Sequence, residues 1–284
     1  MGMDLAIETN QRRLGLGGSA MGTTTFADRY QSILVPVIFE PWAQELIRRA
    51  DPQPGEHILD LACGTGVVTR EVARLAPGSR SLVGADHSGE MLAVARALAA
   101  RDCPDAVWVE ADASTLPFNE DCFDLAFCQQ ALQFFPDRPS ALLELRRVLK
   151  PGGRVAACVQ QNLDINPMLK AQAEALDAHV GTKAGDAVRA ICSLPDGDDI
   201  LELFENAGFR DVDVQSTTLT LYHPDARAFA EGAMGGMHTG DKLSGLPEGA
   251  VDRAVEAFLS GLEDCLDGTV LRFPHVSNVV IARG

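Results

Sequence analysis

The residues of this sequence that could do chemistry begin with a carboxylate beside a glycine turn. Asp60 lies four residues before Gly64, and Gly66 follows in the stretch DLACGTG. Glycines let a backbone approach a ligand closely, and a helix that starts after them offers unpaired N–H groups. A carboxylate at this place would repel a pyrophosphate and attract a cationic or amino-acid-like ligand. The pattern therefore favours a ligand with positive charge and no phosphate.

S-adenosylmethionine (SAM) is such a ligand, because it carries a sulfonium and an ammonium. A dinucleotide-binding loop would place a third glycine at position 69, where this chain has Thr69. The loop therefore favours SAM over NAD. A tight turn between a strand and a helix, with no ligand at all, is the other interpretation that the loop by itself leaves open.

Two more acidic residues follow apolar runs further along the chain. Asp86 comes 20 residues after Gly66, directly after the run at 80–85. An acidic residue in that position can accept hydrogen bonds from both hydroxyls of a ribose. The spacing suits NAD and SAM alike, so it indicates an adenosine and not a particular cofactor. Asp112 comes shortly after the run at 106–110.

Short apolar runs and amphipathic stretches alternate around these residues, which predicts an α/β domain. Sheets of this kind bind ligands at the carboxyl ends of their strands, where the acidic residues would lie together. The chain between 33 and 50 should form one or two helices, broken near Pro36 and Pro41. Strands are expected at 58–62, 80–85, 106–110, 125–128, 154–159, 212–218 and 271–282, and helices at 67–75, 91–100, 139–149 and 198–208.

The order of these motifs resembles that of the class I SAM-dependent methyltransferases, whose first motif has the form D-x-x-x-G-x-G. The stretches LPFNEDCFD at 116–124 and RVLKPGG at 147–153 are similar to those of the ubiquinone- and menaquinone-biosynthesis-type branch, which acts on small molecules. The resemblance covers about residues 54–160 and returns more weakly at 198–219. It implies a Rossmann-like fold, with a seven-stranded, mostly parallel sheet and helices on both faces, and SAM as the cofactor.

The resemblance also implies a set of cofactor-binding residues. In the family, an acidic residue at the place of Asp112 binds the adenine amino group, and the backbone N–H of the next residue, here Ala113, meets a ring nitrogen. His87 and Met91 would flank the adenosine, although core packing is an alternative for Met91. The expected residues are Asp60, Cys63, Gly64, Thr65, Gly66, Asp86, His87, Met91, Asp112, Ala113, Cys128 and Gln129.

No residue of the sequence stands out as a catalytic base, and three candidates remain open. The family often has A-L-H-H after the fourth strand, where this chain has Gln133; a glutamine can orient a substrate but cannot act as a base near neutral pH. Capping of local backbone is the alternative for Gln133. Tyr30 could line the site or pack a helix onto the core. His238 could orient the substrate or act as a base, or it could be an ordinary surface or core histidine.

Composition excludes several classes of partner. The 284 residues include 24 basic and 40 acidic side chains, and the net charge of −16 argues against binding to nucleic acid or to an anionic membrane. No basic-then-apolar signal pattern or apolar run of about 18 residues is present. The seven cysteines form no C-x-x-C pair and the six histidines no H-x-x-x-H pair, which favours a reduced, cytoplasmic protein without a bound metal.

The chain divides into a tail and one methyltransferase domain. Residues 1–25 should be a mobile tail, and residues 26–284 the domain. Two insertions, at about 161–197 and 221–270, should form a helical lid over an acceptor pocket, with Gly235 and Gly236 as a place where it bends.

These observations predict a SAM-dependent methyltransferase that acts on a small, largely apolar acceptor. An NAD-dependent oxidoreductase is the first alternative, and a SAM-binding protein without transferase activity is the second. The sequence leaves open which acceptor is used, whether oxygen, nitrogen or carbon is methylated, whether a general base takes part, and whether the protein forms a homodimer.

Overall fold

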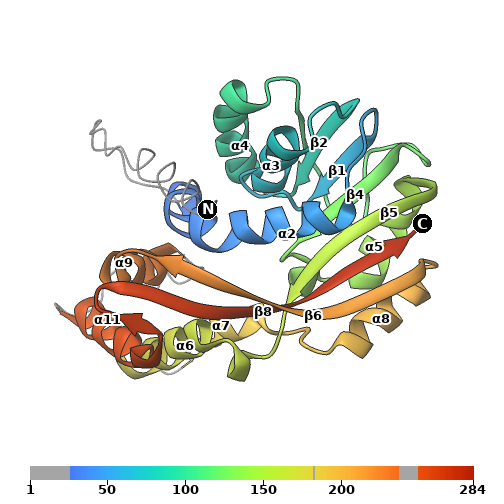
Figure 1. Cartoon of the computed structure of the whole chain (residues 1–284). Helices are drawn as coiled ribbons and strands as arrows, with labels where there is room; N and C mark the ends of the chain where they lie inside the picture. The colour runs from blue at the N-terminus through green and yellow to red at the C-terminus, as the bar shows by residue number, and fades with distance from the viewer. Residues whose placement is uncertain (1–25, 182, 237–248) are drawn as a thin grey trace, which may run out of the picture.

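The computed structural model describes residues 26–181, 183–236 and 249–284, and these ranges contain one mixed sheet with helices on both faces (Figure 1). The expected mobile tail at 1–25 and the candidate His238 lie outside the described residues. The strand order is β3-β2-β1-β4-β5-β8-β6, and β7 pairs with β8. The strands are β1 His57–Leu61, β2 Ser81–Asp86, β3 Val107–Glu110, β4 Phe123–Gln129, β5 Leu149–Gln160, β6 Arg210–His223, β7 Leu266–Asp267 and β8 Val270–Arg283.

The predicted Rossmann-like fold is correct, but the sheet has eight strands and not seven. The first five strands run parallel, and β8 runs antiparallel to both β5 and β6. The additional strand is the two-residue β7, which folds back on the start of β8 around Gly268. Gly268 has a φ of +62°, a conformation that glycine adopts without cost, so this hairpin depends on one residue and not on an apolar run.

The helices of the central part agree with the expected positions to within a few residues. They are α3 Val67–Leu75, α4 Gly89–Asp102, α5 Arg138–Val148 and α8 Gly197–Asn206. The side chain of Ser88 caps α4 by accepting a hydrogen bond from the backbone N–H of Met91. Helices α3 and α4 pack on one face of the sheet together with α2, and α5 and α8 cover the other face (Figure 1).

The predicted break in the N-terminal helical segment is wrong. Helix α1 Phe26–Arg29 continues into the π-helix η1 Tyr30–Phe39 and then into α2 Glu40–Ala50, with helical backbone angles at both junctions. Pro36 lies inside the π-helix, whose wider turns are a common way to accommodate a proline. Pro41 lies in the first turn of α2, where its missing N–H breaks no hydrogen bond.

Strands β6 and β8 continue past the end of β5 as a two-stranded ribbon (Figure 1). Strand β5 ends at Gln160, which pairs with Ser277, whereas β6 and β8 remain paired as far as His223 and Leu271. The second insertion therefore begins after His223 and not at 221, because the strand continues through its expected boundary. The helices around the ribbon are η3 Leu163–Ile165, α6 Pro167–His179, α7 Asp186–Ile191, α9 Ala226–Gly236 and α11 Ala250–Ser260.

Helix α9 includes Gly235 and Gly236, where the sequence predicts that the lid can bend, and that bend stays a prediction. A close contact fixes this helix against the N-terminal segment. A Cβ atom on Gly232 would lie 2.6 Å from Cγ2 of Ile33 in η1, so only a glycine lets the two helices approach this closely. Within the described ranges, no helix combines the length and the hydropathy needed to cross a membrane.

Candidate active site at the carboxyl edge of the sheet

The glycine loop between β1 and α3 turns back on itself through left-handed backbone conformations. Ala62, Gly64 and Gly66 have φ values of 54°, 55° and 77°. The N–H of Gly66 donates to the carbonyl of Cys63 at 2.8 Å, and the N–H of Cys63 donates to the carbonyl of Ala85 at 3.1 Å. The loop is thus fastened to β2 and presents its backbone at the carboxyl edge of the sheet.

Asp60 has a structural partner that the sequence analysis did not identify. Its Oδ2 accepts hydrogen bonds from the backbone N–H of Thr69, at 3.0 Å, and from the Thr69 hydroxyl, at 2.8 Å. Burial raises the pKa of Asp60 to about 7, although both Thr69 hydrogen bonds act in the other direction. Thr69, which the sequence analysis treated only as a missing glycine, therefore ties the end of β1 to the first turns of α3.

Asp86 joins the glycine loop to the end of β2. Its Oδ2 accepts a hydrogen bond from the N–H of Gly64, and its Oδ1 accepts one from the N–H of Ser88, both at 2.8 Å. The neighbouring His87 is largely exposed and lies 3.4 Å from the same carboxylate. A carboxylate has about four acceptor positions, so two remain for the hydroxyls of a ribose. This arrangement is compatible with the expected ribose contact, which stays a prediction.

A tryptophan beneath the loop explains two glycines, and no motif of the sequence indicates it. Trp108 in β3 is the register partner of Gly84 in β2. A Cβ atom on Gly84 would lie 2.5 Å from Cζ3 of this ring, and one on Gly66 would lie 2.3 Å from Cη2. Only glycines therefore allow the indole to support the loop. The contact between Trp108 and Gly84 depends on the pairing of β2 with β3, which the sequence does not show.

The adenine end of the expected site lies at the end of β3. Oδ1 of Asp112 accepts hydrogen bonds from the N–H and the hydroxyl of Ser114, at 2.8 and 2.7 Å, and these bonds hold its pKa below the usual range. The nearby His87 acts on that pKa in the same direction. Asp112 is exposed, whereas Ala113 packs against the core next to the strand. Asp112, His87 and the cap of α4 at Met91 thus lie along one edge, and their contact with the adenosine stays a prediction.

The residues at and directly after the end of β4 form a buried polar cluster. Nε2 of Gln129 donates to the carbonyl of Phe39 at 2.7 Å, and Nε2 of Gln130 donates to the hydroxyl of Ser277 at 2.7 Å. The side chain of Gln133 reaches Oε1 of Gln130 at 3.4 Å and does not cap local backbone. Cys128 is buried at the end of the same strand, and burial raises its pKa to about 12, which keeps the thiol neutral.

Tyr30 lies at the glycine loop and also packs in an aromatic cluster. A Cβ atom on Gly64 would lie 3.9 Å from the Tyr30 hydroxyl. Its ring centroid lies 4.8 Å from that of Phe39 and 6.2 Å from that of Phe26. Burial and the charge of Asp86 raise the pKa of Tyr30 well above its usual value, so the phenol is neutral and can donate a hydrogen bond.

Unsatisfied polar atoms at this edge fit a ligand of the SAM type. Among the described residues, the hydroxyl of Thr65 and Oε1 of Gln129 and Gln133 are buried without a hydrogen-bond partner. Buried polar groups normally have partners, so these atoms, one in the glycine loop and two at and after the end of β4, fit a ligand that carries hydrogen-bond donors. The carboxylate of Asp86 and these oxygens can accept hydrogen bonds from an ammonium or from hydroxyl groups, which SAM supplies.

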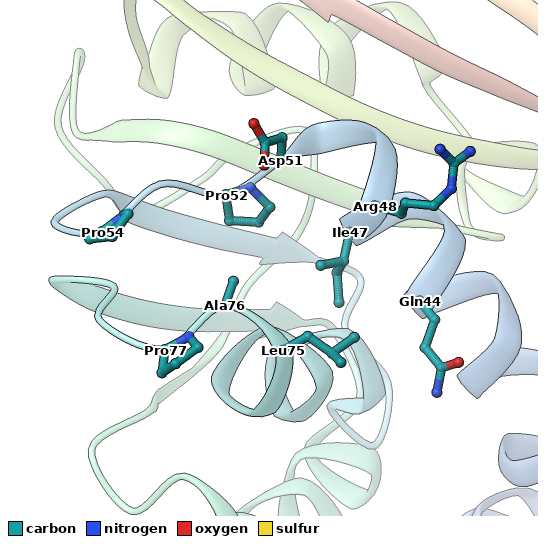
Figure 2. A pocket seen from close by; sticks show the side chains of 9 residues that line it. All are labelled: Gln44, Ile47, Arg48, Asp51, Pro52, Pro54, Leu75, Ala76 and Pro77. Carbon is teal, nitrogen blue, oxygen red and sulfur yellow. The ribbon is translucent and has the colours of Figure 1, made fainter. Parts of the chain in front are cut away.

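The surface pocket of Figure 2 lies away from these residues. It has a volume of about 450 Å³ and lies where α2 and α3 end and β1 is about to begin. Its lining includes Asp51, Pro54 and Leu75 (Figure 2), and none of the expected cofactor-binding residues takes part. This pocket is at the opposite edge of the sheet from the glycine loop and is not the candidate active site.

The chain is similar to known methyltransferases. The family model described as "Methyltransferase domain" matches residues 58–153, which contain the glycine loop and the ends of the first four strands. Demethylmenaquinone methyltransferase of Clavibacter sepedonicus is 34% identical over 204 residues, which are 67% of this chain and 80% of that protein. The 2-phytyl-1,4-naphtoquinone methyltransferase of Synechococcus elongatus is 35% identical over 133 residues, which are 45% of this chain and 56% of that protein.

Other relatives match over a similarly limited span, and the chain spans about half the length of these curated relatives. The structure of Haemonchus contortus phosphoethanolamine N-methyltransferase 2 with S-adenosyl-L-methionine has a TM-score of 0.55 and 20% identity, and the match covers 92% of this chain and 60% of that one. This last similarity concerns the fold alone. With the extended match to the Clavibacter protein, the chain belongs to the class I SAM-dependent methyltransferases, in the branch that includes the demethylmenaquinone methyltransferases.

Proposed function

We propose that this protein transfers the methyl group of SAM to a small, largely apolar aromatic acceptor that carries phenolic hydroxyls, of the naphthoquinol type. The observation that carries the proposal is the position of the ribbon of β6 and β8. It begins at the polar cluster after β4 and leads to buried apolar side chains of the surrounding helices. Phe229, Met234 and Phe273 are three of these side chains. The names of the relatives, which refer to naphthoquinone-type compounds, support this acceptor class.

The residues of the chain would bind and orient the reactants. The backbone of the loop at Gly64 and Gly66, the Thr65 hydroxyl and the Asp86 carboxylate would hold the cofactor, and Asp112 would meet the adenine. When bound, SAM supplies a methyl group on a positively charged sulfur, which leaves as a neutral thioether. The amide of Gln133 would orient the acceptor, and the apolar helices around the ribbon would exclude water.

The acid–base properties of the site favour an acceptor that needs no protein base. Tyr30 and Cys128 have raised pKa values and stay protonated near neutral pH. Asp60 has a pKa of about 7 but is bound to Thr69 in the core. A reduced naphthoquinone, as a naphthoquinol, has an electron-rich ring and acidic hydroxyls and can therefore attack a methyl group with little help. An unactivated alcohol would need a base, which these residues do not provide.

The helices around the ribbon would act as a lid, and residues 26–284 would work as one catalytic domain. The excess of acidic residues supports a small-molecule acceptor in place of nucleic acid or an anionic membrane. The cysteines, all unpaired in the described ranges, support a reducing compartment such as the cytoplasm. Light scattering of the purified protein would show whether it is a monomer or a homodimer.

Two measurements test the function. Calorimetric titration should show binding of SAM and of its demethylated product, S-adenosylhomocysteine, and no binding of NAD. The protein should then transfer label from methyl-labelled SAM to a 2-prenyl-1,4-naphthoquinone that is kept reduced with dithionite, and the product should gain the mass of one CH₂. Binding of NAD without SAM would indicate an oxidoreductase. Binding of SAM without transfer to this acceptor would refute the proposed acceptor class and leave a SAM-binding protein.

A further inference from the structure

A buried histidine lies on the ribbon and is fixed by a tryptophan of α2. His275 in β8 is 3% exposed, and its Nδ1 accepts a hydrogen bond from Nε1 of Trp42 at 2.9 Å. Because Nδ1 accepts, the proton of the neutral ring must be on Nε2. Among the side-chain hydrogen bonds of the described residues, His275 has this one at Nδ1, and none starts from its Nε2–H. The tryptophan therefore determines which nitrogen of His275 is the donor.

The register of β8 places His275 between the end of β4 and the apolar helices. Alternate residues of a strand share a face, so Phe273, His275 and Ser277 point the same way. The Ser277 hydroxyl accepts the hydrogen bond from Gln130, which directly follows β4. The Phe273 ring lies 5.7 Å from that of Phe229 in α9. An aromatic molecule that extended from the polar cluster toward these rings would pass His275.

His275 can act as a donor and not as a base. Burial lowers its pKa to about 3, so the ring is neutral at any pH at which the enzyme would work. A neutral imidazole whose Nδ1 is already occupied offers one N–H and no lone pair. Such a group binds an oxygen and rejects a hydrocarbon surface, because an unpaired buried N–H is costly.

We infer that the Nε2–H of His275 recognises one oxygen of the acceptor, next to the ring carbon that is methylated, and that Trp42 is a positioning residue that fixes the donor nitrogen. This inference rests on the proposed function. In carbon methylation, a carbon–carbon bond forms and the carbon–sulfur bond of SAM breaks, leaving a neutral thioether. The methylated ring carbon then loses its proton to solvent water as the ring becomes aromatic again. His275 takes no proton in these events. Its Nε2–H donates a hydrogen bond to the oxygen that supplies electron density to the ring.

Two variants of His275 distinguish the loss of the Nε2–H donor from other effects of replacing the side chain. In His275→Gln, the amide nitrogen takes the place of Nε2, so a donor remains near the acceptor. In His275→Asn, the amide reaches only the inner position near Trp42. The probe is 2-prenyl-1,4-naphthoquinol, kept reduced and titrated into each protein in complex with S-adenosylhomocysteine, so that binding is measured without turnover. His275→Asn should weaken binding of the probe and raise its KM at least about tenfold, while His275→Gln stays within about threefold of the wild type.

Two further readouts keep the test independent of folding defects. Affinity for SAM should be unchanged in both variants, because His275 lies away from the glycine loop. Nitrogen-15 NMR of the wild type should show a protonated Nε2 and an unprotonated Nδ1, and Trp42→Phe should populate the other tautomer. A wild-type ring protonated on Nδ1 would contradict the assignment directly.

Analogues of the probe that lack one or the other hydroxyl identify the oxygen. The wild type should bind one analogue at least about tenfold more weakly than it binds the diol. His275→Asn should bind that analogue and the diol with nearly equal affinity. Equal binding of the diol and of both analogues by the wild type would overturn the inference even if the Asn variant did not fold. If the naphthoquinol is methylated and His275→Asn binds it normally, the inference fails and the proposed function stands. If the wild type binds SAM but neither binds nor methylates the naphthoquinol, the proposed acceptor class fails, and the role of His275 with it.

Discussion

Lowering the pH should destabilise this protein through His275, and replacement of that residue should remove the effect. Burial lowers the pKa of His275 from 6.5 to about 3, so below pH 6.5 the unfolded chain binds a proton that the folded chain does not. The stabilising contribution is complete above pH 6.5 and is lost as the pH falls toward about 3. Each pH unit is worth about 1.4 kcal/mol. Between pH 7 and pH 5 this group should therefore cost about 2 kcal/mol of unfolding free energy.

The comparison must be made between variants, because Asp60 acts in the opposite sense. Burial raises the pKa of Asp60 from 3.8 to about 7, so the folded chain binds the extra proton, and stability falls as the pH rises through that range. In the wild type the two contributions nearly cancel between pH 5 and pH 7. His275→Gln removes one of them and leaves the other.

Urea unfolding followed by circular dichroism at pH 5, 6 and 7 measures the difference. The unfolding free energy of His275→Gln relative to the wild type should rise by about 2 kcal/mol when the pH is lowered from 7 to 5. Replacement of His87 by Gln removes a histidine whose side chain is 86% exposed and serves as the control for the loss of an imidazole. Parallel curves for His275→Gln and the wild type would show that His275 titrates normally in the folded protein, and the assignment of a permanent neutral donor would then be wrong.

Three other changes test the site. Gly84→Ala should lower the unfolding free energy by about 1–3 kcal/mol and reduce the melting temperature, because its Cβ would lie 2.5 Å from Trp108, and a smaller residue at 108 should restore part of the loss. Asp60→Asn should lack the loss of stability that the wild-type carboxyl causes between pH 5 and pH 7, about 2 kcal/mol by urea unfolding. Asp86→Ala should weaken SAM binding at least about tenfold by calorimetry while the protein stays folded, and unchanged affinity would exclude both the ribose contact and a need for the Gly64 hydrogen bond.

The elements that sequence could predict are those whose signal is local. Helix α3 begins and ends where its amphipathic pattern does, and the first five strands coincide with short apolar runs. The errors occur where another part of the chain decides the outcome. Pro36 predicts a break in the helix, but the helix continues through it because η1 is a π-helix, whose turns are wider. Strand β7 is two residues long and exists only because β8 lies beside it. The boundary at 221 fails because β6 follows its partner as far as His223.

The residues of the candidate site also fall into those with a local sequence signal and those that only the fold brings together. Asp86 and the glycines were found because their spacing along the chain is fixed by one strand, one turn and one helix. Trp108 and Gly84 were missed because they meet across two strands. His275 was missed for a stronger reason, since Trp42 is 233 residues away in the sequence and His275 belongs to no motif. The sequence makes His238 a candidate because it lies beside the small and flexible residues of the expected lid, whereas strand register places His275 near the end of β4.

The candidate site combines buried neutral groups with the carboxylates of Asp86 and Asp112. Tyr30, Cys128 and His275 would all be able to exchange protons in water, and burial moves each pKa away from neutrality in the direction that keeps the group uncharged. A transferase that had to deprotonate its acceptor would require at least one of these groups to be near neutrality. An electron-rich acceptor requires from the protein only alignment, a hydrogen-bond donor for its oxygen and the exclusion of water. Under the proposed function, burial leaves Tyr30, Cys128 and His275 unable to act as bases, and phenolic and enolic acceptors would therefore be favoured over alcohols.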